Sequence, residues 1–149
     1  MAENSPYFES GARFTFKASP QLTLTALVLN GWQNIRETNQ SKALGTQLQW
    51  KPTAKLLLNS STFYGNEQPV DSVRRRRLFH NFYASYTAIQ RLSLALVFDF
   101  GHQQGGAGST GGDAWQTGAA FMRYQLAEKW YAALRAEYYQ ADAALSSTR

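Results

Sequence analysis

The segment Leu92-Ser-Leu-Ala-Leu-Val-Phe-Asp-Phe100 places a large apolar residue at every second position. Strict alternation of this kind gives a β-strand one apolar face and one mixed face, and a helical period fits the segment less well. The segments 12–18 and 130–138 alternate in the same way. The chain is therefore predicted to be all-β.

Extending the same reading along the chain predicts eight strands with short or long connections between them. Their expected ranges are 7–18, 22–33, 42–51, 55–65, 77–88, 91–102, 114–126 and 130–140. These strands exceed the usual five or six residues. Tilted strands of about 9–11 residues are the length that a bilayer crossing needs.

Short and long connections between the predicted strands alternate at a regular spacing. Four short connections end at Leu22, Leu56, Leu92 and Trp130, which lie 34, 36 and 38 residues apart. Longer polar connections, over 33–41, 66–76 and 103–113, alternate with them. Tight turns on one rim and long loops on the other are typical of outer-membrane barrels. We therefore expect an antiparallel up-and-down transmembrane β-barrel, in a single domain.

The even spacing of the repeat keeps residues of one parity on one face. The even positions are nearly free of charge and are predicted to face lipid; they include Phe14, Phe16, Leu22, Leu24, Leu92, Leu94, Leu96 and Leu134. The odd positions carry the charges predicted to face the lumen: Glu9, Arg13, Lys17, Lys51, Arg77, Asp99, Arg123, Arg135 and Glu137. Charge at the bilayer midplane costs about 2–4 kcal/mol for Arg or Lys, which explains its exclusion from the lipid face.

Aromatic residues crowd both ends of the apolar face. The predicted girdles comprise Trp32, Trp50, Tyr64, Tyr86, Tyr124, Trp130 and Tyr138, and two such girdles match the two bilayer interfaces. A soluble calycin-like barrel that binds an apolar ligand would show the same alternation with its faces reversed. The soluble barrel is therefore the alternative fold, and the strand lengths and the two girdles argue against it.

Composition excludes several classes of protein. The chain of 149 residues has no Cys and only two His, so we expect neither a Cys-ligated metal site nor a cofactor. Its formal charge of +5 depends largely on the run Arg74-Arg-Arg-Arg77. Nucleic-acid binding needs aromatic residues interleaved with the charge, and no such pattern is present. No apolar run is long enough for a transmembrane helix.

Five segments resemble the OmpL-like β-barrel porin family of Gram-negative outer membranes. They are 4–12, Leu27-Val-Leu-Asn-Gly-Trp-Gln33, Leu58-Asn-Ser-Ser-Thr-Phe-Tyr-Gly-Asn66, Phe79-His-Asn-Phe-Tyr83 and Leu134-Arg-Ala-Glu-Tyr-Tyr-Gln140. The resemblance runs along almost the whole chain and implies location in the bacterial outer membrane. With the polar lumen, we expect porin-like passive diffusion of small hydrophilic solutes, with no enzymatic step.

Complete members of this family are longer and begin with an export signal, which residues 1–6 do not resemble. We therefore expect an internal fragment that supplies eight strands of a larger barrel. A self-contained eight-stranded barrel, filled by its side chains, is the alternative.

The predicted lumen charges, six basic and three acidic, favour anions weakly if they act on permeating ions. Alternatively they pair across strands and only keep the lumen hydrated. The run of Arg74, Arg75, Arg76 and Arg77 is a candidate contact for lipopolysaccharide phosphates; a solvated loop is the simpler interpretation.

A hydrolase active at the barrel rim is the third class of function. His80, His102 and Asp99, with Ser61 or Ser85 as nucleophile, are its candidate residues, although no local motif joins them. The glycine-rich segment 105–113 lacks the Lys-Ser/Thr ending of a phosphate loop and is expected to be an extracellular loop.

Overall fold

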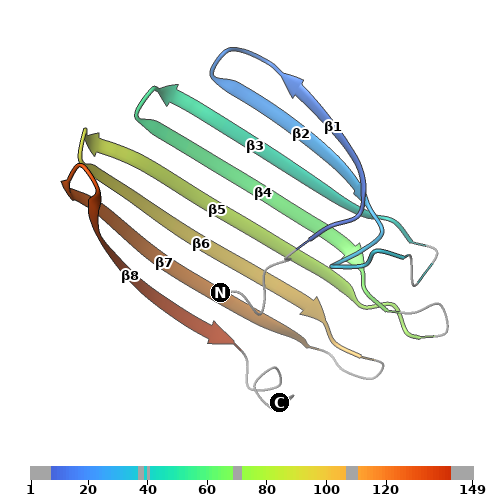
Figure 1. The fold of residues 1–149 in the computed structure, drawn as a ribbon. Helices are drawn as coiled ribbons and strands as arrows, with labels where there is room; N and C mark the ends of the chain where they lie inside the picture. The colour runs from blue at the N-terminus through green and yellow to red at the C-terminus, as the bar shows by residue number, and fades with distance from the viewer. Residues whose placement is uncertain (1–7, 37–38, 40, 69–71, 107–110, 142–149) are drawn as a thin grey trace.

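The computed structural model describes residues 8–36, 39, 41–68, 72–106 and 111–141. Its fold is all-β, with eight strands (Figure 1): β1 (Gly11–Lys17), β2 (Leu22–Leu29), β3 (Ala43–Thr53), β4 (Leu56–Asn66), β5 (Arg76–Ile89), β6 (Leu92–Gln104), β7 (Gly112–Ala127) and β8 (Trp130–Ala141). In the described part of the chain, no helix is long and apolar enough to span a membrane.

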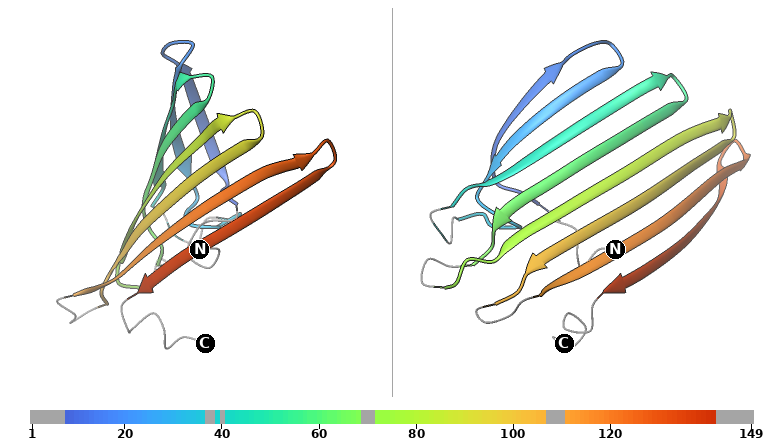
Figure 2. Two further views of the ribbon diagram at one scale, coloured as in Figure 1. Left: turned by 90° about the vertical axis from the view of Figure 1, so that its left-hand side faces the viewer. Right: turned by 180° about the vertical axis from the view of Figure 1, so that it is seen from behind.

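The strands form one antiparallel sheet in sequence order, so every strand pairs only with its neighbours along the chain. The prediction of an up-and-down all-β fold is confirmed. The sheet is strongly curved, and both edge strands bend toward its concave face (Figure 2). β1 and β8 are not paired with each other among the described residues, so the sheet remains open.

The register joins residues of like parity along most of each strand pair. Thr25 pairs with Gln47, for example, and Asn81 pairs with Asp99. Consequently one face of the sheet carries even-numbered residues and the other carries odd-numbered ones. Parity is lost only at three bulges beside the tight turns, between Trp50 and Thr53, Thr87 and Ile89, and Gln125 and Ala127.

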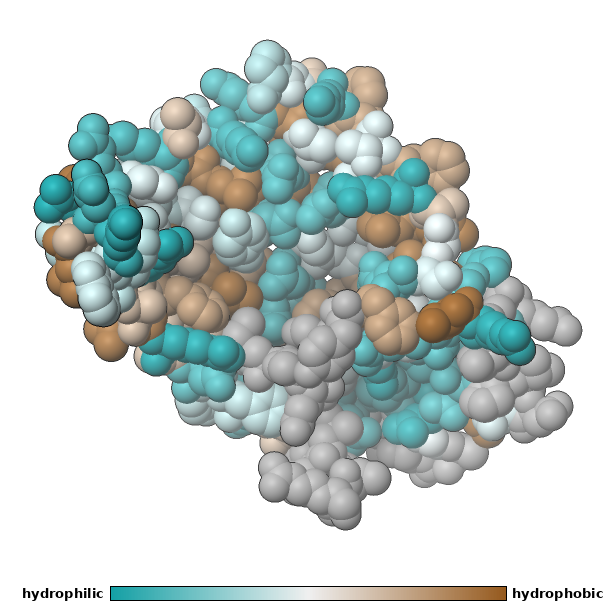
Figure 3. All heavy atoms as spheres, viewed as in Figure 1, coloured by the Kyte–Doolittle hydropathy of each residue, from teal (hydrophilic) through white to brown (hydrophobic). Residues whose placement is uncertain are grey.

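The convex face carries the even-numbered side chains, which are largely apolar and exposed. Phe14, Phe16, Leu24, Leu94, Leu96 and Leu134 are all exposed there, and Leu22 and Leu92 are half-buried. The concave face carries the odd-numbered side chains and faces the viewer in Figure 1. Hydrophilic side chains run through the middle of the concave face, with hydrophobic patches to either side (Figure 3).

A small apolar cluster packs on the concave face near the long connections. It comprises Leu29, Trp32, Ala43, Phe63, Phe79 and Trp115. The Trp32 ring meets the rings of Phe63 and Phe79 edge to face, with centroids 5.0 Å apart in each pair. Such pairs add about 0.5–1.5 kcal/mol to the burial of the rings. This cluster fixes the connection after β2 against the sheet.

Two strand ends, the start of β1 and the end of β2, differ from the predicted ranges by four residues, and the other ends differ by two residues or fewer. β2 ends at Leu29 rather than at residue 33, because the backbone turns at Gly31 (φ 121°) and Gln33 (φ 58°). Glycine adopts such a conformation without strain. β1 begins at Gly11, and the predicted start at residue 7 lies outside the described residues. Three further segments also lie outside the described residues: residues 4–7, residues 107–110 of the glycine-rich segment, and residues 142–149.

Candidate functional site on the concave face

A row of polar side chains crosses the concave face, one from each strand. Directly paired residues make up the row, in the order Thr15, Thr25, Gln47, Ser61, Asn81, Asp99, Thr117 and Tyr139. All are odd-numbered, so alternation sends every one of them to the same face. Two members of this row were predicted site residues, Asp99 as a lumen charge and Ser61 as a candidate nucleophile. The others were not identified, because residue type alone does not give the register between strands.

Hydrogen bonds link the members of this polar row. Asn81 Nδ2 donates to Asp99 Oδ1 at 2.6 Å, and Thr117 Oγ1 donates to Asp99 Oδ2 at 3.1 Å. Both carboxylate oxygens of Asp99 therefore have a donor, although the residue is only 1% exposed. Burial of a carboxylate is tolerated when its oxygens are hydrogen-bonded in this way.

A second chain of hydrogen bonds runs over β3 and β4. Gln47 Nε2 donates to Asn59 Oδ1 at 2.9 Å, and Asn59 Nδ2 donates to Ser61 Oγ at 2.9 Å. Between the edge strand β1 and its neighbour β2, the hydroxyls of Thr15 and Thr25 lie 3.3 Å apart. The polar side chains of the concave face are thus held in defined orientations by one another.

A cleft of about 470 Å³ lies on the concave face over β2–β5. Its wall includes Thr25, Gln47, Ser61 and Asn81 of the polar row, together with Phe63 and Phe79 of the apolar cluster. Phe8 and Glu9, which precede β1, and Arg13 of β1 close its other side. The described residues that precede β1, 8–10, lie over the concave face (Figure 1). Burial raises the pKa of the Glu9 carboxyl.

Arg77 lies between two indole rings at the long-connection end of the concave face. Its guanidinium carbon is 5.1 Å from the centroid of Trp32 and 5.9 Å from that of Trp115. Arg77 Nε donates to Gln103 Oε1 at 2.7 Å. Cation–π contacts strengthen when they are desolvated, as here.

Glu67, in the connection after β4, holds the Trp32 backbone. Its Oε2 accepts the Trp32 N–H at 2.9 Å. Burial raises the pKa of the Glu67 carboxyl, and the Trp32 N–H and the charge of Arg77 oppose that effect only in part. Glu67 Oε1 and Trp115 Nε1 are buried without a hydrogen-bond partner among the described residues.

Asn39 fastens the β2–β3 connection to the β4–β5 connection. Its Nδ2 donates to the carbonyl oxygens of Asn66 at 2.8 Å and Gln68 at 3.0 Å, and its Oδ1 accepts the Ser41 N–H at 2.8 Å. Asn39, Glu67 and Gln103 were not found by sequence analysis. No local pattern reveals them, because their partners are distant in the sequence. Gln103 contacts Arg77 across the β5–β6 pair, and Asn39 and Glu67 contact residues of another connection.

The predicted lumen charges share the odd-numbered face but do not gather at one level. Lys17 and Lys51 lie toward the tight turns, and Arg123 stacks on Tyr131 at 4.0 Å. Arg135 and Glu137 form an ion pair with each other, whereas the sequence analysis considered pairing across strands. Glu9 and Arg13 line the cleft over β2–β5.

The arginine run divides between the two faces of the sheet. Arg75 turns toward the protein, where its Nε donates to the Gln104 carbonyl at 2.8 Å and its guanidinium lies 3.5 Å from Asp113. Arg76 lies on the opposite face, and its Nη1 donates to the Tyr64 hydroxyl at 3.0 Å. The four arginines therefore do not form one patch: Arg75 and Arg77 bind protein groups, whereas Arg74 and Arg76 are exposed.

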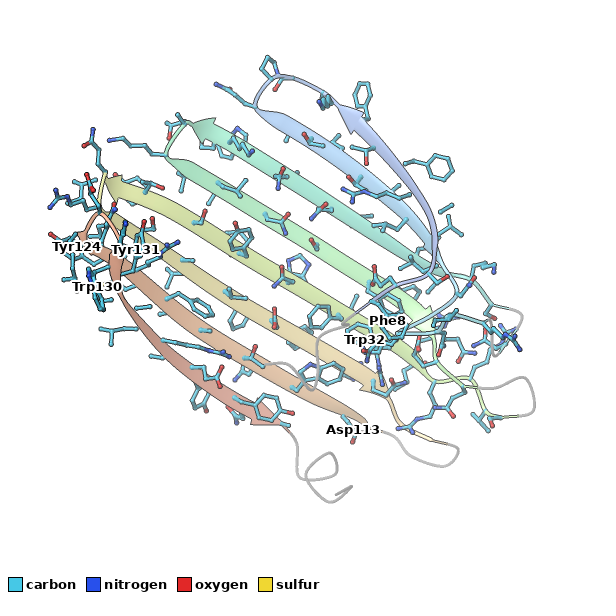
Figure 4. All side chains as sticks on the ribbon, in the orientation of Figure 1. Phe8, Trp32, Asp113, Tyr124, Trp130 and Tyr131 are labelled. Carbon is cyan, nitrogen blue, oxygen red and sulfur yellow. The ribbon has the colours of Figure 1, made fainter. Side chains whose placement is uncertain are left out.

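Six of the seven predicted girdle residues are exposed side chains of the convex face; Trp32 is the exception. Trp32 is 8% exposed and packs on the concave face, because the turn at Gly31 interrupts the alternation on which its assignment depended. Figure 4 shows Trp32 and Phe8 over the long-connection half of the sheet, and Tyr124, Trp130 and Tyr131 at the tight turns.

The candidate hydrolase residues are not assembled. His80 lies on the convex face, where Nδ1 is 2.9 Å from Thr62 Oγ1 and Nε2 is 3.4 Å from Ser60 Oγ. Asp99 and Ser61 lie on the concave face. The backbone of the sheet thus separates His80 from Asp99 and Ser61. Within the described ranges, no group of three or more His, Asp or Glu could hold a metal ion.

An up-and-down sheet of long strands, apolar on its convex face and polar on its concave face, defines a protein of the β-barrel porin class. The family described as "Putative beta-barrel porin-2, OmpL-like" matches residues 1–148, and the chain belongs to this family. The resemblance noted from the sequence is thereby confirmed. Comparison with curated proteins and with solved structures gives no match.

Proposed function

We propose that the protein mediates porin-like passive diffusion of small hydrophilic solutes across the bacterial outer membrane. The observation that carries the proposal is the direction of curvature: the polar row lies on the concave face and the exposed apolar side chains lie on the convex face. A membrane barrel needs an apolar exterior and a polar interior. A soluble calycin-like barrel needs the reverse, with apolar side chains on the concave side.

Family membership favours a pore over an enzyme, and the separation of His80 from Asp99 and Ser61 also argues against the hydrolase alternative. The partners of this proposal are the lipids of the outer membrane and small hydrophilic solutes. Nucleic acid is not among them. The polar row hydrates the pathway and requires no cofactor.

Conductance in planar bilayers tests the proposal. The full chain, refolded in lipid, is expected to give discrete ion-conducting steps. A chain that inserts, as judged by a heat-dependent shift in gel mobility, but carries no current would contradict the proposal. The triple variant Arg13→Gln, Lys17→Gln and Arg123→Gln is expected to conduct with a smaller preference for anions. An unchanged reversal potential would show that these charges do not select ions.

We also propose that the two exposed residues of the arginine run, Arg74 and Arg76, contact lipopolysaccharide phosphates. Both are exposed at the long-connection end, and Arg76 lies 5.9 Å from the Tyr64 ring centroid at the border of the apolar face. Arginine binds phosphate oxygens through its planar fork of donors. Arg75 and Arg77 are engaged with protein groups and are not part of this contact.

Replacing Arg74 and Arg76 with Gln is therefore expected to lower the affinity of the folded chain for lipopolysaccharide-containing vesicles several-fold. Arg91→Gln, which removes an exposed arginine beside a tight turn, is the matched control. Equal losses from both variants would point to non-specific charge attraction and would discard the proposed contact. Binding is measured by vesicle co-flotation at two salt concentrations.

A further inference from the structure

The cleft on the concave face has the size and lining of a small-molecule site. Its volume of about 470 Å³ falls within the range of about 300–1,000 Å³ of known ligand pockets. Its lining combines aromatic rings with a few oriented polar groups, which is the usual composition of such pockets. It is one place along the polar row where a solute could pause.

The charges around the cleft balance. Glu9 and Arg13 are the ionisable residues of its lining, one of each sign. A lining with no net charge gives no electrostatic preference for an anion or for a cation. The occupant that fits best is therefore uncharged.

The orientation of two amides is set by groups outside the cleft. Asp99 only accepts hydrogen bonds, so Asn81 must turn its NH2 group toward Asp99, which leaves Asn81 Oδ1 as its remaining polar atom. Gln47 Nε2 likewise donates to Asn59 Oδ1, so Gln47 Oε1 remains as an acceptor. Ser61 accepts from Asn59, so its hydroxyl hydrogen remains to be donated. The wall thus offers two acceptor oxygens and the hydroxyl donor of Ser61, together with the second N–H of each amide.

An uncharged solute that matches this pattern must both donate and accept hydrogen bonds, and it must also tolerate apolar contact. Phe63 and Phe79 form buried parts of the wall, and Phe8, 47% exposed, lies across from them. Hydroxyl groups donate and accept at once, and the ring of a saccharide also carries apolar C–H surface.

From this combination of neutral charge, fixed amides and aromatic walls, we infer that the cleft is a binding site for neutral saccharides on the diffusion pathway. The inference rests on the proposed porin function and names the class of solute that the pathway favours. A transient site of this kind raises the local concentration of solute without blocking its exit, provided that binding is weak.

The test uses the full chain folded in micelles, with glucose as the probe and saturation-transfer NMR as the measurement of binding. Gluconate, an anion, and choline, a cation, are the comparison solutes. Glucose is expected to give a saturable signal, and neither ion is expected to compete with it. A site that prefers gluconate or choline would overturn the inference.

Adjacent serines provide a matched pair of variants. Ser61→Leu fills the cleft and is expected to weaken glucose binding about tenfold. Ser60→Leu adds the same side chain to the convex face, away from the cleft, and is expected to bind glucose like the wild type. Equal binding by the two variants would overturn the inference. If Ser61→Leu does not fold, Phe8→Ala replaces it, with Phe14→Ala, an exposed phenylalanine of the convex face, as its control.

The same preparations separate this inference from the proposed function. Bilayer current measured without sugar reports the pore, and the NMR titration reports the site. An intact current without saturable glucose binding overturns the saccharide site and leaves the pore. Saturable binding without current overturns the pore.

Discussion

Gly101 lies directly opposite Trp115 in the β6–β7 pair, and the indole of Trp115 covers it. A Cβ atom at residue 101 would overlap the ring, so only glycine leaves room for Trp115 to lie flat in the apolar cluster. Gly118, on the opposite face of β7, has no atom near the position of its missing Cβ. The two glycines therefore have different structural roles.

Gly101→Ala is expected to displace Trp115 and to lower the free energy of unfolding by about 1–3 kcal/mol, as overpacking generally does. Gly118→Ala is the control and is expected to leave stability unchanged or slightly higher, since it adds a methyl group to the apolar face. Urea titration of the refolded chain, followed by tryptophan fluorescence, measures both. A neutral Gly101→Ala variant would mean that Trp115 does not depend on this glycine.

Among single residues, the odd or even residue number predicted which face of the sheet most candidate side chains occupy, including those of Asp99 and Arg135. Trp32 was placed wrongly because one positive-φ residue, Gly31, ends the alternation. Glu67 and Asn39 were missed because side chains in irregular connections follow no period. Their positions depend on tertiary contacts that no short pattern contains.

At the level of the elements, all eight strands were predicted, since alternation over many residues is a strong signal. The ends were less exact: β5 begins one residue earlier than expected and β7 two residues earlier. The three bulges beside the tight turns were not predicted, because a bulge adds a residue without changing composition. They allow each hairpin to close while the rest of the strand keeps its parity.

Leu96 and Val97 are neighbours in β6 that point to opposite faces. Substitutions at these two residues therefore test which face of the strand meets lipid. Leu96→Arg places a charge on the convex face and is expected to cost about 2–4 kcal/mol of stability in a bilayer if it lies near the midplane. Val97→Arg places the same charge on the concave face, near Asp99, and is expected to cost far less. Folding efficiency in vesicles measures both; a reversed order would mean that the faces are inverted.

On the scale of the whole molecule, curvature is the property that sequence reasoning could not derive. Alternation identifies an apolar face and a polar face, but both soluble and membrane barrels satisfy it. The structure adds that the sheet bends around its polar side, with Asp99 and Thr117 almost fully buried there. That direction depends on the twist and coiling of all eight strands together, and no single segment contains it.

Because every strand pairs only with its sequence neighbours, the hairpin is also a natural unit of gene evolution. Duplication or loss of one repeat would add or remove two strands at once, without rerouting the chain or crossing a connection. A single-codon insertion inside a strand, in contrast, would turn all the following side chains of that strand to the wrong face. Insertions and deletions among homologous genes should therefore concentrate in the connections over 30–42, 67–75 and 105–111.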